Sequence, residues 1–190
     1  TDNEGNIITS DKATYDKRNE KIVTYNNTEM MLKEGYKLVS KNISYDTLKK
    51  ILSSNENTIF TDMDGNTIET TMFQYDIDNN LFSSIGKIKV LDINKNKYFF
   101  KEIHIDTIKK EMIGSDVSVV LDQQNFGVSE KSDPRFVAND IFVSKNITTL
   151  SKGVFTVCQK KEGECPPWSL KARKIVHDSV KKIYIMNMQF

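Results

Sequence analysis

The stretch GNTIETTMFQYDIDNNLFSSIGKIKVLDIN, from Gly65 to Asn94, contains one complete β unit. It begins at a glycine turn, and apolar and polar residues then alternate up to Phe73-Gln74-Tyr75-Asp76. A polar turn over residues 77–80 follows, and a second run descends from Leu81 to about Leu91. Alternation with a period of two is typical of a strand with one buried face. The stretch therefore predicts two strands joined by a short turn.

The same unit recurs at a step of 30 residues. Its ascending run ends at Thr14-Tyr15-Asp16, Ser44-Tyr45-Asp46, Gln74-Tyr75-Asp76 and His104-Ile105-Asp106. Gly5, Gly35 and Gly65 share the step, and residues 94–96 fill the next slot. After two insertions, at about 122–135 and 158–167, the Tyr-Asp slot is filled by Val143-Ser144 and His177-Asp178. A period of this length indicates a repeat protein in which each unit buries its apolar face against its neighbours.

The repeat predicts about six two-strand units, or roughly twelve strands, and no helix. Residues 46–52 and 106–112 admit a second interpretation as capped amphipathic helices, with Asp46 or Asp106 as the N-cap. The equivalent residues 17–20 and 77–80 of other copies are poor helix formers. Strands are therefore predicted throughout, and the insertion from residue 122 is predicted to be an exposed loop.

Length and charge limit the class of protein. The chain has 190 residues, 28% of them charged, and a net charge of +1. This balance gives no overall field that would attract nucleic acid or anionic lipid, and no nucleic-acid partner is predicted. The unbroken repeat favours a single domain over residues 1–190. Because Thr1 lies almost on a repeat boundary and Phe190 ends within the pattern, we expect a mature segment of a longer protein.

Two strands per repeat with short turns must be antiparallel, and the repeat is too long for the rung of a parallel β-helix. The predicted fold class is all-β, an elongated antiparallel β-jelly-roll with exposed strand edges at its ends. Bare edges of this kind often pair with a partner by strand addition. Alternation predicts that one set of side chains faces the interior: Phe73, Tyr75, Phe99, Ile103, Ile105, Ile141, Val143 and Ile175, with the small residues Ala13, Ala138 and Ala172 among them. They could form an ordinary packed core or line an interior that is not fully packed.

The two cysteines, Cys158 and Cys165, flank one short polar loop. A structural zinc site needs about four closely spaced ligands, and the two histidines lie elsewhere in the sequence, so no metal is predicted. A local Cys158–Cys165 disulfide is the favoured hypothesis, with two free thiols as the alternative. A disulfide would place the chain outside the cytoplasm.

The sequence lacks the patterns of an enzyme, and no cofactor is predicted. His177-Asp178, and His104 with Asp106, could be read as a base and the carboxylate that orients it. Both pairs occupy the slot filled by Tyr-Asp elsewhere, which favours a role in the turns. The aspartates of this slot are expected to accept hydrogen bonds from turn amides: Asp16, Asp46, Asp76, Asp106 and Asp178.

The segment from Cys158 to the end of the chain carries the most specific motif. Cys158 is followed by the run from Cys165-Pro166-Pro167-Trp168 to His177-Asp178, and then by Lys182-Ile183-Tyr184-Ile185. This pattern resembles the end of the periplasmic domain of the LptD family, the lipopolysaccharide-assembly outer-membrane proteins also called organic solvent tolerance proteins. The repeat over nearly the whole chain is similar to the OstA-like repeat that this family shares with the LptA and LptC bridge proteins.

The resemblance implies a periplasmic domain of an outer-membrane protein in a Gram-negative bacterium, followed by an outer-membrane β-barrel. The inward-facing residues given above would form a groove that shelters the acyl chains of lipopolysaccharide. The N-terminal edge would pair with an LptA-like bridge protein, and the barrel would bind an LptE-like lipoprotein. The cysteines depart from the family pattern, because here both lie in one loop. Two alternatives stay open: a free-standing bridge protein, and a carbohydrate-binding or structural β-sandwich with a packed core.

Overall fold

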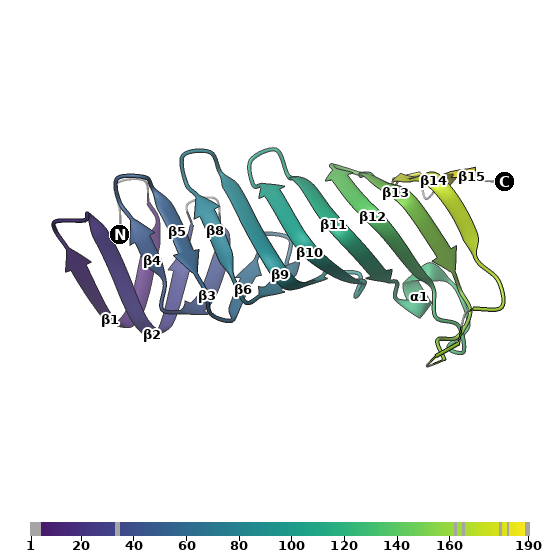
Figure 1. Cartoon of the computed structure of the whole chain (residues 1–190), viewed down its shortest axis with the longest axis horizontal. Helices are drawn as coiled ribbons and strands as arrows, with labels where there is room; N and C mark the ends of the chain where they lie inside the picture. Colours follow the sequence, from purple (N-terminus) through teal and green to yellow (C-terminus); the bar gives the residue numbers. More distant parts are fainter. Residues whose placement is uncertain are drawn as a thin grey trace. The chain divides into compact units, whose positions relative to one another are not determined.

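The computed structural model of the chain describes residues 5–32, 35–161, 163–164, 166–178, 180–181 and 183–188. In these ranges the backbone forms antiparallel strands, short turns and one helix (Figure 1). The strands are β1 (Ile7–Asp16), β2 (Lys21–Met31), β3 (Lys37–Lys41), β4 (Ser44–Asp46), β5 (Ile51–Ser54), β6 (Thr58–Thr61), β7 (Thr67–Thr70), β8 (Phe73–Asp76), β9 (Leu81–Leu91), β10 (Lys97–Asp106), β11 (Glu111–Val120), β12 (Arg135–Ser144), β13 (Ile147–Thr156), β14 (Leu170–Asp178) and β15 (Ile183–Met188).

The nearly all-β character predicted from the repeat is confirmed. Three of the predicted strands are each divided into two shorter ones, which accounts for the larger number of strands. Residues 46–52 and 106–112 form a turn followed by a strand, so the helical interpretation of these segments is wrong.

The helix α1 (Gln123–Phe126) lies in the first insertion, where a loop was predicted. The side chain of Asp122 accepts a hydrogen bond from the backbone N–H of Asn125, which caps the first turn. Gly127 ends the helix in the left-handed conformation, with φ of 78°. The prediction missed one helical turn because a segment this short has no apolar periodicity. Among the described residues, no helix has the length and hydropathy needed to cross a bilayer.

The chain groups into two compact units, residues 1–93 (unit 1) and 94–190 (unit 2), and each is described by itself. In unit 1, β2 pairs with β1, β3 and β4, and β9 pairs with β7 and β8. The pairs β3–β6, β6–β7, β4–β5 and β5–β8 complete two rows of strands between β2 and β9. One row contains β3, β6 and β7, and the other contains β4, β5 and β8.

The two rows form two layers because the long strands bend. Residues 21–23 of β2 pair with β4, whereas residues 27–31 pair with β3. The bend lies at Asn26, whose φ is 65°, and the matching bend of β9 lies at Gly86, with φ of 116°. The chain also crosses from one layer to the other between β3 and β4, and the strand is interrupted there at Asn42, with φ of 53°. The layers are therefore joined along the line of bends, and apolar side chains lie between them.

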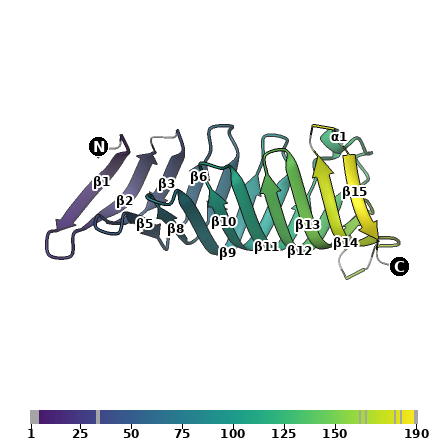
Figure 2. The same ribbon diagram turned by 90° about the horizontal axis from the view of Figure 1, so that it is seen from above.

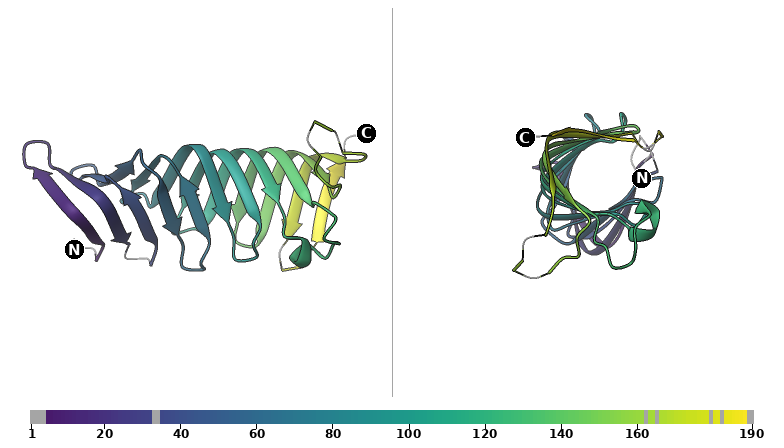
Figure 3. Two further views of the ribbon diagram at one scale, coloured as in Figure 1. Left: turned by 90° about the horizontal axis from the view of Figure 1, so that it is seen from below. Right: turned by 90° about the vertical axis from the view of Figure 1, so that its right-hand side faces the viewer.

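Unit 2 is a meander in which β10 to β15 pair in sequence order (Figure 2). Its strands also bend from one layer into the other, as the curved teal to yellow ribbons of Figure 3 show. The bends of β11 and β13 lie at Asp116 and Lys152, with φ of 50° and 51°. Lysine and aspartate are strained in this region, so the bends rely on the surrounding strand pairing.

The two residues of the Tyr-Asp slot directly precede a four-residue turn. These turns, here called the apical turns, lie at residues 17–20, 47–50, 77–80 and 107–110. In each turn the aspartate before it accepts a hydrogen bond from a turn N–H, at 2.8–3.3 Å. Asp178 accepts from Val180 and Lys181 in the same way, at 3.1 and 3.0 Å. The predicted role of these aspartates is confirmed.

We expect these turns to make the fold sensitive to acid. Hydrogen bonds from the side chain of Asn19 or Asn79 and from turn amides hold the pKa of Asp16 and Asp76 below its usual value. Amides of the following lysines do the same for the pKa of Asp106 and Asp178. A lowered folded-state pKa contributes stability above the unfolded pKa of about 3.9, which is lost as the pH falls through the folded value.

The measurement is the melting temperature at about pH 6 and at about pH 3, in the wild type and in a variant with all four aspartates replaced by asparagine. Asparagine keeps an acceptor oxygen but does not titrate in this range. The variant should lose less stability on acidification than the wild type. An equal loss in both proteins would contradict the assignment.

Candidate functional site

The candidate site is the interior between the two layers, which the predicted lipid-binding residues were expected to line. Five of them are buried to between 0 and 2% exposure: Phe73, Tyr75, Ile103, Ile141 and Ile175. Ile105 and Val143 are half-buried near the apical ends of β10 and β12. Of the small residues expected among them, Ala138 and Ala172 are buried, but Ala13 is exposed on β1.

The inward orientation predicted for Phe99 is wrong. Phe99 is 40% exposed, and its neighbour Phe100 is buried at 4% exposure. The buried positions of β10 are Phe100 and Ile103, three residues apart. On β11 they are Gly114, Val117 and Val119, with the positive φ of Asp116 between the first two. The bend therefore shifts the alternation, and an unbroken period of two assigns the wrong face beyond it.

The interior of unit 1 is filled by aromatic rings from both layers. Phe82 of β9 packs against Phe60 of β6 in the opposite layer, with 4.9 Å between ring centroids. Phe82 also stacks on Phe73 of its own layer at 5.9 Å, and Phe60 stacks on Tyr36 at 5.2 Å. All four side chains are buried. The layers of unit 1 are therefore in direct contact through Phe60 and Phe82.

A row of buried hydroxyl groups lines the inside of the bend in unit 1. Ser40 bonds Thr58 at 2.7 Å, and Thr70 bonds Ser84 at 2.6 Å. These hydroxyls also satisfy backbone groups where the strands break, as Ser84 does by donating to the carbonyl of Met72 at 2.7 Å. Burying such groups is tolerable only when they are hydrogen-bonded, so the row stabilises the bend.

Sequence reasoning missed this row, although a signal for it exists. Thr24, Ser54 and Ser84 stand at the repeat step of 30 residues, and the next position in the series is Gly114. The interior of the bend is thus hydroxyl-lined in unit 1 and apolar at the equivalent place in unit 2.

The bend of unit 2 is closely packed against two glycines. A Cβ atom at Gly114 would lie 2.6 Å from Cδ1 of Phe100 and 3.2 Å from Cγ2 of Ile141. A Cβ atom at Gly153 would lie 2.6 Å from Cδ1 of Ile175. The side chains of Phe100 and Ile175 therefore occupy the space above these glycines.

Replacing Gly114 with alanine should destabilise unit 2 by about 1 to 3 kcal/mol, because the Phe100 ring cannot move without disturbing the core. Gly153→Ala should cost less, since the clashing atom is the terminal methyl of Ile175, which can rotate. Denaturant unfolding gives both values. A second change, Phe100→Leu, should recover part of the loss in Gly114→Ala. Equal effects of the two glycine variants would contradict this packing.

The structure places each histidine beside another side chain. His104 Nε2 lies 2.9 Å from a carboxylate oxygen of Glu102, and Asp106 caps its turn. The ring of His177 stacks on Tyr184 at 4.2 Å between centroids. Burial lowers the pKa of His177, partly offset by Asp178. Among the described residues, no group of three or more potential ligands is placed to hold a metal ion.

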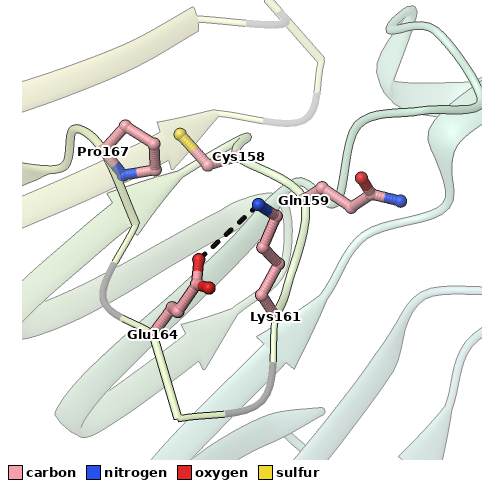
Figure 4. A pocket seen from close by; sticks show the side chains of 5 residues that line it. All are labelled: Cys158, Gln159, Lys161, Glu164 and Pro167. Atoms are coloured by element: carbon pink, nitrogen blue, oxygen red, sulfur yellow. Dashed lines mark ion pairs between the residues drawn. The ribbon is translucent and has the colours of Figure 1, made fainter.

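A small hollow of about 260 Å³ lies at the cysteine loop (Figure 4). It is lined by Cys158, Gln159, Lys161, Glu164 and Pro167. Lys161 and Glu164 form an ion pair across it at 3.6 Å, and the hydrogen bond with Thr156 lowers the pKa of the Cys158 thiol. Cys165 lies outside the described residues, so the disulfide stays a prediction.

The terminal strands carry the edges expected to bind partners. Within the described part of unit 1, β1 pairs with β2 alone, and in unit 2 β15 pairs with β14 alone. The β1–β2 register shifts between Ser10 and Lys12, where Asn26 and Asn27 of β2 form a bulge opposite Asp11. Most of β1 is exposed. Strand addition at these edges stays a prediction.

The fold is similar to that of LptH, described as the LptA homologous periplasmic component of the conserved lipopolysaccharide transport device from Pseudomonas aeruginosa. The two structures align with a TM-score of 0.50 and 16% sequence identity, over 57% of this chain and 80% of LptH. At this identity the likeness concerns the fold. It confirms the predicted fold class, an LptA-like β-jelly-roll. No family model and no curated protein matches the sequence.

Proposed function

We propose that this chain carries lipopolysaccharide, sheltering its acyl chains between the two β-layers and passing them on for outer-membrane assembly. The observation that supports this function is the fold shared with LptH, together with the row of buried apolar side chains between layers whose strands continue from one layer to the other at the bends. Burial of apolar area contributes roughly 25 cal/mol per Å2, so acyl chains between the layers would gain several kcal/mol.

Loading requires the layers to separate. The candidate side chains Phe73, Ile103 and Ile141 are at most 2% exposed, so acyl chains must take the place of contacts that now join the layers. Separation at the turns leaves the bends intact, because strand pairing holds them in both units and the hydroxyl row also holds them in unit 1. The acyl chains would enter from the side of the turns.

We place the chain in the periplasm and favour the LptD-like role, in which the domain passes lipid to an outer-membrane barrel with an LptE-like partner. This preference rests on the run from Cys165 to Asp178 and its resemblance to that family. A free-standing bridge protein is the alternative, since LptH is described as an LptA homologous periplasmic component. In either role, β1 would pair with an LptA-like protein, and a photo-crosslinker at Thr9 should then capture that protein.

A second candidate is a structural β-sandwich with a permanently packed core. The close contact of Phe60 and Phe82, and the absence of space for a Cβ at Gly114, favour it. Such a domain would bind no acyl chains.

Native mass spectrometry of the whole chain with lipopolysaccharide, and with the same lipopolysaccharide after chemical deacylation, separates the candidates. Transport predicts a complex with the acylated form only. Binding of both forms would indicate recognition of the sugar, and binding of neither would favour the packed core.

A further inference from the structure

The insertion between β11 and β12 contains a side chain that the proposed function does not use. The equivalent connection of unit 1, between β6 and β7, spans residues 62–66, whereas the insertion spans residues 121–134 and includes α1 (Figure 1). Phe126, the last residue of α1, is half-buried. Its ring packs on Phe155 of β13 and on Tyr184 of β15, with 5.9 and 6.2 Å between ring centroids.

The two rings that Phe126 contacts belong to different layers of unit 2. In the strand register, Tyr184 is aligned through β14 with Thr148 of β13, which precedes the bend at Lys152. Phe155 follows that bend, so it lies in the other layer. The ring of Phe126 therefore bridges the two layers.

The bridge lies at the ends of the strands, away from the bends. Phe136 of β12 stacks on Phe155 in its own layer at 4.5 Å and on Tyr184 in the other layer at 6.1 Å. Phe136 and Tyr184 are each the second residue of their strand, and Phe155 is the last but one of β13. These rings thus close the interior of unit 2 on the side of the turns, where the acyl chains would enter.

Hydrogen bonds hold α1 to one layer. The side chain of Asn125 donates to the carbonyl of Asn94 at 2.7 Å, and the backbone N–H of Asp122 donates to the side chain of Asn96 at 2.9 Å. Asn94 and Asn96 lie in the loop before β10, at the same strand ends as the loop after β13. The contact with Tyr184 in the other layer is made by an aromatic ring. When the layers separate, the backbone of α1 can stay in place while this ring contact breaks.

We propose that Phe126 is a latch on the interior of unit 2, closed in the unloaded chain and displaced by the acyl chains of lipopolysaccharide. This inference rests on the proposed function and adds regulation to the same site. In the closed state the ring bridges Phe155 and Tyr184, in the path of an acyl chain that enters from the side of the turns. Once the ring is displaced, the acyl chain covers the apolar surface of these two partners.

The position of Phe126 suits a contact that opens and closes. The interlayer contact of unit 1 is made by Phe60 and Phe82, two fully buried rings on strands. Phe126 is only half-buried and lies outside the strands, so its displacement exposes less apolar area and breaks no strand pairing.

A closed latch lowers the apparent affinity for lipid, because only the open fraction of molecules can load. Removing the ring of Phe126 should therefore strengthen lipid binding. Removing a side chain that lines the lipid path should instead weaken it, since contacts with the acyl chain are lost. The direction of the change separates these two roles.

The test is a titration of the whole chain with lipopolysaccharide, followed by native mass spectrometry. Phe126→Ala should bind about tenfold more tightly than the wild type, the factor expected when two ring contacts no longer favour the closed state. The matched control is Trp168→Ala, which removes a ring 45% exposed that packs on Phe155 at 6.4 Å. Trp168 precedes β14 by two residues, at the end that pairs with Phe155, so this contact lies within one layer. The control should bind like the wild type.

Both variants should stay folded, since neither ring belongs to a strand, and circular dichroism checks this. Phe126→Leu keeps a smaller apolar side chain and should have an affinity between those of the wild type and Phe126→Ala. Equal or weaker binding by Phe126→Ala overturns the latch but leaves lipopolysaccharide binding in place. An equal gain in Phe126→Ala and Trp168→Ala also overturns it, because general loosening of this end of unit 2 would explain both. Binding by neither the wild type nor Phe126→Ala overturns the proposed function together with the latch.

Discussion

Replacing Phe82 with alanine should lower the free energy of unfolding by about 3 to 5 kcal/mol, the usual cost of removing a fully buried aromatic ring. Phe82 has no exposed surface and contacts rings from both layers of unit 1, Phe60 at 4.9 Å and Phe73 at 5.9 Å. Its removal leaves a cavity at the place where the layers meet. Denaturant unfolding followed by circular dichroism measures the loss.

The control for this variant is Phe142→Ala, which removes the same ring from the outer face of β12, where it is 39% exposed. That change should cost less than about 1 kcal/mol. Similar losses in the two variants would contradict the packed contact between the layers of unit 1.

The second large effect is expected at Ile141, which is 1% exposed and faces Gly114 and Leu150 on the two neighbouring strands. Ile141→Asp places a carboxylate in an apolar interior, where its ionised form loses hydration without gaining a partner. The cost is several kcal/mol, comparable with the total stability of a domain. We expect unit 2 to unfold or to lose its cooperative transition, as seen by circular dichroism and NMR.

The adjacent residue provides the comparison. Phe142→Asp changes an outward side chain in the same strand and should leave unit 2 folded. If Ile141→Asp were as stable as Phe142→Asp, water would have to reach position 141. That result would contradict the burial of Ile141 in an apolar interior.

The repeat step predicted most of the fold. It located the strands and the turns, and it placed the capping aspartates, because strand alternation and turn chemistry are local properties. Three breaks were missed, such as that at Asn42 between β3 and β4. A bend at a non-glycine residue depends on pairing with distant strands, which a single sequence does not display.

The candidate site was predicted less completely for the same reason. Positions on one side of a bend kept their predicted face, as Phe73 and Ile141 did. Phe99 did not, because the alternation shifts at the bend before Ile103. Opening of the interior also depends on whether contacts between the layers or contacts with lipid contribute more free energy. The spacing of residues in the sequence does not report this difference.

The most direct measurement of the central claim compares neighbouring residues on opposite faces of one strand. Photo-crosslinking residues are placed singly at Phe100, buried, and at Phe99, 40% exposed, and the folded proteins are irradiated with lipopolysaccharide. The pair at Ile141 and Phe142 repeats the comparison on β12. Transport between the layers predicts capture at positions 100 and 141 and none at 99 and 142. Equal capture on both faces, or none at the two buried positions, would contradict it.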